Sequence, residues 1–403
     1  MGLRFISAFG LFVMLAIAWL LSENRKAISW RLVAWGIGLQ VAIAVLVLKT
    51  GLREAIFPKA SAAVDVLTQA TLAGATFVFG PKLPVDPGLG AIFAFQVLPV
   101  IIFVSALSAV LHHLRVIPVV VGAIAWLMRR TLKTSGAETF CAALQIFLGI
   151  EASAAVRVYI KNMTRSELCV IMTTYMGTIA GSVMVVYSTF GAEAGHLLTA
   201  SFMSAPAAIL LSKMLVPETG KPETSGETKL EVPVESHNIM DAAAQGTAQG
   251  LSMALHVGAT LIVFIGMVFL LDLALNSVTG YTFVDILGVA FRPFAWLLGV
   301  PGEDVTAVAK LLGKKTVLNE FLSYLDLQEL IRQKAISQRS ITIATYALCS
   351  FANPGSIGIT LAGLDALAPE RRSDVAQLCL KAFIGGALAS LMTACIAGVI
   401  VYE

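Results

Sequence analysis

Two glutamates lie inside stretches that are otherwise strongly apolar, and they are the clearest chemical signals in the chain. Glu151 falls between two apolar runs within 135–161, and Glu320 lies in the middle of 302–334. A carboxylate at the centre of a membrane costs at least about 2.5–3.5 kcal/mol on insertion scales, so polar groups must meet it. A site for a solute or an ion is the favoured interpretation. A structural hydrogen bond or ion pair inside a helix bundle is the alternative.

Each glutamate is followed by a segment that can interrupt a helix, Thr178–Ser182 in the first case and Asn353–Ser356 in the second. The second is the clearer break, because Pro354 removes a backbone donor and Gly355 permits unusual dihedrals. Broken helices leave about four unpaired backbone groups at each end. In lipid such groups are tolerated only around a polar cavity. Close helix packing is the alternative role of the small residues in the first segment.

The composition places the chain in a membrane. Hydrophobic residues make up 57% of its 403 residues and charged residues 13%, whereas soluble domains carry about 45–50% and about 25%. This excludes an ordinary soluble enzyme and a disordered protein. The net charge of +3 does not suggest a nucleic-acid partner. The five cysteines are dispersed and are expected to be packing residues, so no cofactor is expected.

The pattern of apolar segments predicts an all-α integral membrane protein. A bilayer core about 30 Å thick needs about 20 apolar helical residues, which shorter paired runs do not reach. We therefore expect eight transmembrane helices, two re-entrant hairpins at 135–161 and 302–334, interfacial helices within 50–82 and 284–300, and a short apolar helix at 116–127. The expected spans are 5–21, 32–48, 90–111, 166–190, 195–215, 250–275, 341–364 and 375–401.

An internal repeat follows from the hairpins. The intervals from Glu151 to Ser182 and from Glu320 to Ser356 are similar in length, and paired broken segments in two halves are typical of a transporter site near the midplane. An intramembrane enzyme is disfavoured because no HExxH or GxSxG motif is present. We divide the chain into scaffold spans with an interfacial helix (1–115), the first hairpin and broken span (116–215), a polar loop with a scaffold span and interfacial helix (216–300), and the second hairpin and broken span (301–403).

Several longer motifs resemble the concentrative nucleoside transporters over nearly the whole chain. They are Met163-Thr-Arg-Ser-Glu-Leu168, Thr178-Ile-Ala-Gly-Ser-Val183, Ser204-Ala-Pro-Ala-Ala208, Lys315-Thr-Val-Leu-Asn-Glu-Phe321, Ala344–Asn353 and Leu367–Asp374. The resemblance implies a homotrimer in the inner (plasma) membrane, with a mobile transport domain. It also implies symport of nucleosides with a cation, for which sodium is favoured over a proton. A transporter of another ribosylated or polar solute and an uncoupled facilitator are the alternatives.

The resemblance also implies roles for individual residues. In the second half, Glu320 would accept hydrogen bonds from ribose hydroxyls, with Asn319 in support. Phe351, Asn353 and Ser356 would complete the ribose pocket.

The first hairpin of this family reads the nucleobase. Its usual tip, Gly-Gln-Thr/Ser-Glu-Ala-Pro, is here the shorter Gly149-Ile-Glu-Ala-Ser153. Glu151 falls on the family glutamate, Ile150 replaces the residues that carry the amide and hydroxyl, and Val183 would pack on the base. Base preference is therefore open, and Gln145 or another side chain could restore the lost contacts. The family's sodium ligands correspond to Gln145, Leu148, Thr178 and Ile179.

Overall fold

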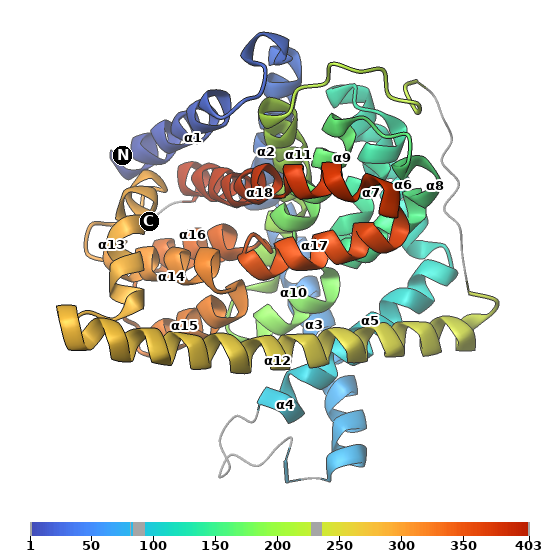
Figure 1. Ribbon diagram of the computed structural model, residues 1–403. Coiled ribbons are helices and arrows are strands. Elements are labelled where there is room, and N and C mark those ends of the chain that lie inside the picture. Colours follow the sequence, from blue (N-terminus) through green and yellow to red (C-terminus); the bar gives the residue numbers. More distant parts are fainter. Residues whose placement is uncertain (1, 81, 84–92, 227–235, 402–403) are drawn as a thin grey trace.

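The computed structural model describes residues 2–80, 82–83, 93–226 and 236–401, and these residues form an almost wholly helical protein (Figure 1). Short 3-10 helices are η1 (Arg25–Ala27), η3 (Gly149–Val156) and η4 (Pro369–Arg371). In chain order the α-helices are α1 (Gly2–Leu20), α2 (Trp30–Lys49), α3 (Leu52–Phe79), α4 (Phe93–Gln96), α5 (Leu98–His113), α6 (Val116–Leu132), α7 (Gly136–Leu148), α8 (Arg157–Ile160), α9 (Arg165–Gly177), α10 (Gly181–Thr189), α11 (Ala194–Leu215), α12 (Ile239–Thr279), α13 (Phe283–Leu297), α14 (Val305–Val317), α15 (Glu320–Arg332), α16 (Gln338–Leu348), α17 (Pro354–Leu367) and α18 (Arg372–Ile400).

Nine helical segments within the described ranges are long and apolar enough to cross a membrane, judged by length and composition. Seven of them cover predicted spans, although the start of 90–111 lies outside the described residues. The predicted span 341–364 is not among the nine because it is divided into α16 and α17 at the expected break before Pro354. The helix predicted over 250–275 is longer than expected, because Asn238 caps α12 and the Ala-rich stretch that follows favours a helix.

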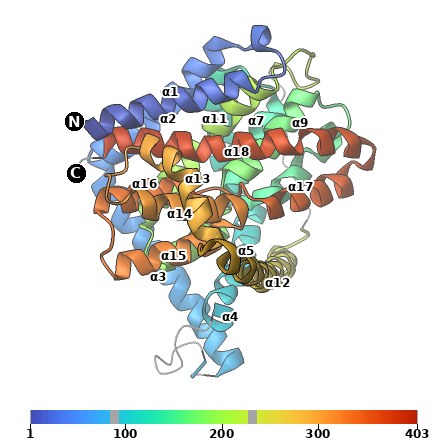
Figure 2. The ribbon, with the colours of Figure 1, turned by 60° about the vertical axis from the view of Figure 1, so that its left-hand side comes forward.

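The segment expected to form an interfacial helix within 50–82 is the main difference. It folds into the single 28-residue helix α3, whose length and composition allow it to cross a membrane. The reason is that its four charges lie between Arg53 and Asp65, which leaves the second half of the helix apolar. Both views show the end of α3 projecting beyond α12, with α4 beside it (Figures 1 and 2). Its placement at an interface stays a prediction.

The two halves repeat one order of elements. In the first half, α7 leads through a break to η3 and α8, and α9 is then separated from α10 by Thr178–Ala180. In the second half, α14 leads through a break to α15, and α16 is then separated from α17 by Cys349–Asn353. The arms of each predicted hairpin contact each other. Both breaks are therefore present, although the second lies at 349–353, just before most of the predicted Asn353–Ser356, because Pro354 begins α17. The re-entrant placement of the hairpins stays a prediction.

The last helix, α18, lies at the centre of the molecule and contacts α1, α2, α9, α11, α16 and α17 (Figure 2). Small residues permit this close packing. A Cβ atom added at Gly386 of α18 would lie 2.8 Å from Met176 Cβ and 3.0 Å from the backbone nitrogen of Gly177. Because the nearest atoms include the backbone of α9, which cannot rotate away, the two helices would have to separate.

We expect Gly386→Ala to destabilise the protein by about 1–3 kcal/mol, the usual cost of overpacking a core. Gly38→Ala on α2 is the matched control, because no atom lies within 4 Å of a Cβ added there. Thermal unfolding of detergent-purified protein measures both. A melting temperature for the Gly386 variant equal to that of the control would show that α9 and α18 are not in the contact described.

Candidate substrate and cation site

The two breaks of the second half bring together the residues predicted to bind a sugar. Asn319 lies in the break before α15 and caps it, because its Oδ1 accepts a hydrogen bond from the Leu322 N–H at 3.0 Å. Asn353 caps α17 in the same way, accepting from the Ser356 N–H at 3.0 Å. The N-termini of both helices are thus formed by asparagine caps next to buried polar side chains. A helix N-terminus favours negative charge, and Glu320 occupies the first position of α15.

Both carboxylate oxygens of Glu320 accept hydrogen bonds inside the protein. The Tyr187 hydroxyl donates to Oε1 at 2.8 Å, and the Asn353 amide donates to Oε2 at 2.8 Å. Glu320 is 4% exposed. Since each carboxylate oxygen can accept more than one hydrogen bond, the group can still accept from the hydroxyls of a ligand.

Tyr187 is the residue through which the two halves meet at this carboxylate. It lies on α10 of the first half, whereas its partner lies on α15 of the second. Its ring stacks on Tyr324 with centroids 4.1 Å apart and meets Phe321 edge-on at 5.0 Å. Aromatic pairs of this kind are worth about 0.5–1.5 kcal/mol beyond the area they bury. The hydroxyl is therefore held in a fixed place beside Glu320.

A buried lysine lies close to the same group. Lys315 is 2% exposed, and its Nζ donates to the carbonyl of Ala347 and to the hydroxyl of Ser390, both at 2.7 Å. It is within electrostatic range of Glu320. The ammonium group thus meets a carbonyl near the end of α16, where the helix leaves its last carbonyls unpaired, and it offsets the buried negative charge.

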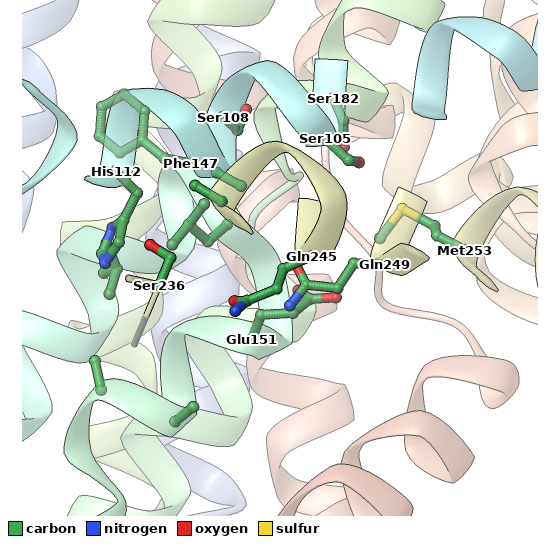
Figure 3. A pocket seen from close by; sticks show the side chains of 16 residues that line it. Ser105, Ser108, His112, Phe147, Glu151, Ser182, Ser236, Gln245, Gln249 and Met253 are labelled. Atoms are coloured by element: carbon green, nitrogen blue, oxygen red, sulfur yellow. The ribbon is translucent and has the colours of Figure 1, made fainter. Parts of the chain in front are cut away.

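The first hairpin borders a separate polar cavity of about 260 Å³. Gly149 begins the tip with φ of +68°, a conformation that favours glycine. Glu151 faces the cavity and Ser182 of α10 lines it (Figure 3). Val183, which follows Ser182 in the chain, is buried and is not part of the cavity lining. The opposite wall comes from α5 and α12, with Ser105, Ser108, His112, Gln245, Gln249 and Met253.

Unlike Glu151, Ile150 does not line the cavity. Its Cγ1 lies against α17, 3.2 Å from where a Cβ of Gly363 would be. Ile150 thus packs between the first hairpin and the second broken helix. The Glu320 cluster is not part of the cavity lining, but Tyr175 is within electrostatic range of both glutamates and its ring lies 5.9 Å from that of Phe351.

The four residues predicted to bind sodium lie at the end of α7 and the break after α9. Gln145 is fully buried; its Oε1 accepts from the Thr174 hydroxyl and its Nε2 donates to the Ile171 carbonyl at 3.1 Å. The Thr178 hydroxyl donates to the Thr174 carbonyl at 2.8 Å. Thr174 thus connects two of the predicted ligands.

This region offers the oxygen atoms that a hard cation prefers, from the Gln145 amide, the Thr178 hydroxyl, and the carbonyls of Leu148 and Ile179 at the helix ends. The Gln145 side chain is held by α9 rather than directed towards Glu151. It therefore does not restore the contacts that the shortened tip lacks.

Several residues of this region could not be chosen from the sequence. Tyr187 has no local signal, because its partner is distant in the chain, and Thr174 is one of many threonines inside a span. Lys315 stands within a motif that resembles the family, five positions before Glu320, and that spacing was the available signal. Gln245 and Gln249 carry a weaker one, an amide pair at helical spacing near the start of a long apolar helix.

The fold and the paired breaks define a membrane transporter with an internal repeat. Residues 196–398 match the C-terminal part of the family described as Na+ dependent nucleoside transporters, residues 9–82 match its N-terminal part, and residues 94–194 match a nucleoside recognition domain. The chain therefore belongs to the sodium-dependent nucleoside transporter family, which confirms the resemblance. It is a multi-pass membrane protein and not an enzyme.

Relatives agree with this assignment. An uncharacterized transporter of Bacillus subtilis, YutK, is 40% identical over 97% of this chain and 98% of its own. Sodium/nucleoside cotransporter 1 of the rat is 38% identical over 98% of this chain, which spans 64% of the cotransporter's length. The structure of CNTnw in an inward-facing substrate-bound state has a TM-score of 0.93 and 38% identity, and covers 98% of both chains.

A double-mutant cycle tests the bond that joins the halves. We expect Tyr187→Phe and Glu320→Gln each to lower the free energy of unfolding. Their coupling energy is expected to be about 0.5–3 kcal/mol, the range for residues in direct contact. Unfolding of the purified protein in a denaturing detergent measures the four variants. Effects that add to within about 0.3–0.5 kcal/mol, as at independent sites, would contradict the contact.

Proposed function

We propose that this protein is a cation-coupled symporter that imports nucleosides across the inner (plasma) membrane. The observation that carries the proposal is the buried cluster in which Glu320 and Asn353 meet at two helix breaks, with Ser356 in the next turn. A carboxylate, an amide and a hydroxyl supply the acceptors and donors that a ribose requires. The rat relative is named as a sodium/nucleoside cotransporter, which agrees with this substrate class.

The roles proposed for the site follow from its two halves. Glu320, with Asn319, Asn353 and Ser356, binds the ribose hydroxyls, and Phe351 lines the pocket beside Tyr175. Glu151 faces the base from the first hairpin, and Val183 of α10 packs on it. Because Ile150 offers no amide, transport of another ribosylated or polar solute is the second candidate.

Sodium is proposed as the coupling ion in preference to a proton. Gln145, Leu148, Thr178 and Ile179 supply oxygen atoms of the kind that bind hard cations. One cation that moves down 100 mV supplies about 2.3 kcal/mol. At about 1.4 kcal/mol per factor of ten, this supports roughly 50-fold accumulation before any ion gradient is counted.

A homotrimer is proposed for the assembly, as the family resemblance implies. The long helix α12 agrees with a role in assembly, since most of its apolar side chains are exposed and it packs chiefly on α5. Cross-linking in membranes measures the number of subunits.

Glu320→Gln tests the ribose assignment. The variant keeps the shape of the side chain and removes the charge that strengthens hydrogen bonds to hydroxyls. We expect near-complete loss of uridine uptake by proteoliposomes with normal expression in the membrane. Glu329→Gln is the matched control on the same helix, because Glu329 is exposed and paired with Arg332. Unchanged uptake by the Glu320 variant would exclude the ribose assignment.

Thr178→Val tests the coupling ion. It keeps the volume of the side chain and deletes one oxygen ligand, so the sodium dependence of uptake should shift to higher concentration. Thr342→Val is the control, since it removes another buried hydroxyl that bonds only to its own helix. A shift in the dependence on pH with no effect of sodium would favour the proton. Wild-type uptake that ignores sodium, pH and uncouplers would instead identify a facilitator.

A further inference from the structure

The cavity beside Glu151 has a second polar wall, which the hairpin does not supply. Gln245 and Gln249 lie one turn apart on α12 and both line the cavity, with Ser105 and Ser108 of α5 beside them. In Figure 3 the amide ends of the two glutamines gather near the carboxyl group of Glu151. The cavity therefore lies between the hairpin on one side and the pair of helices α5 and α12 on the other, and Glu151, Gln245 and Gln249 remain accessible from it.

Close helix packing fixes the position of this wall. A Cβ atom added at Gly246 would lie 2.7 Å from the Cα of Ala106, and one added at Gly250 would lie 2.8 Å from the Cα of Ile102. Small residues four apart let two helices approach until their backbones touch. Since each glutamine directly precedes one of these glycines, the contact between α5 and α12 sets the height and the direction of both amides.

One of the amides is also oriented by its own helix. Gln245 Nε2 donates to Asp241 Oδ1 at 3.1 Å, and Asp241 Oδ2 accepts from the backbone N–H of His237 at 2.8 Å. This bond uses one N–H of the Gln245 amide. Its second N–H and its carbonyl oxygen are groups that a ligand in the cavity can use.

These amides supply the chemistry that the hairpin tip lacks. Ile150 stands where the family has an amide and a hydroxyl, and it packs against α17 at Gly363. A nucleobase presents donors and acceptors side by side along its edges. A glutamine amide carries both kinds of group and reverses them by rotation, so it can match a base with a carbonyl or with an amino group.

We propose that Gln245 and Gln249 of α12 read the edge of the nucleobase while the hairpin holds it from the other side. This inference rests on the proposed function and assigns base recognition to a wall outside the hairpin. Because the Gln249 amide can rotate to match either kind of base, the wild-type protein discriminates weakly among bases, while Gln245 is held by Asp241. Uridine, cytidine, adenosine and inosine should compete within roughly tenfold of one another, as expected for a gain or loss of about one hydrogen bond.

Gln249→Glu converts an adaptable amide into a group that only accepts. We expect cytidine and adenosine to gain about tenfold as competitors relative to uridine and inosine, because the carboxylate bonds to an exocyclic amino group but repels the carbonyl oxygen that uridine and inosine carry at that position. Competition with labelled uridine uptake in proteoliposomes measures the four ratios. Thr247→Val on the same helix is the control, because its hydroxyl bonds to the Ala243 carbonyl and it does not line the cavity.

A second variant keeps the test decisive if the charged one is not recovered in the membrane. Gln249→Leu should weaken all four competitors, by about fivefold for one lost hydrogen bond. An unchanged order of competitors in the Glu variant, or unchanged competition in the Leu variant, would overturn the inference. The proposed function would still stand as long as the wild type takes up nucleosides. Absence of nucleoside uptake by the wild type would overturn both.

Discussion

The constraint on which this structure depends is that helix ends and carboxylates buried in an apolar bundle need polar partners. A backbone group left unpaired in lipid costs several kcal/mol. The second half meets this requirement with asparagine caps at Asn319 and Asn353, and with two donors on Glu320. Each group that pairs with Glu320 or with a helix end in the absence of a ligand can also form a hydrogen bond to a polyhydroxylated solute. The requirement for stability thus produces groups that fit the proposed binding chemistry, and for that reason the proposed site lies at the breaks.

The sequence predicts those parts of the site that depend on local signals. A break at Asn353 is expected because Pro354 cannot donate to the preceding turn, and the structure ends α16 at Leu348 and begins α17 at Pro354, with Ser356 in the first turn of α17. Tyr187 could not be predicted, because its bond to Glu320 depends on how the halves pack rather than on spacing in the chain.

The interfacial expectation for α3 shows another limit of sequence reasoning. Charges between Arg53 and Asp65 suggested an interface, but a helix continues wherever nothing breaks it, and the second half of α3 is apolar. The sequence shows where the charges lie along the segment. It does not show which way the helix runs against its neighbours, so the interfacial placement of α3 stays a prediction.

One backbone contact gives the proposed coupling a physical route. The Phe351 N–H donates to the Thr178 carbonyl at 3.3 Å, which joins the break of the first half to that of the second. A cation bound by the oxygens around Thr178 would restrain this same segment. Asn353, two residues beyond Phe351, donates a hydrogen bond to the carboxylate of Glu320. Ordering of the first break would therefore restrain the segment that carries Asn353, the donor to Glu320. Because linkage is reciprocal, a solute bound at Glu320 would tighten the cation site by the same factor.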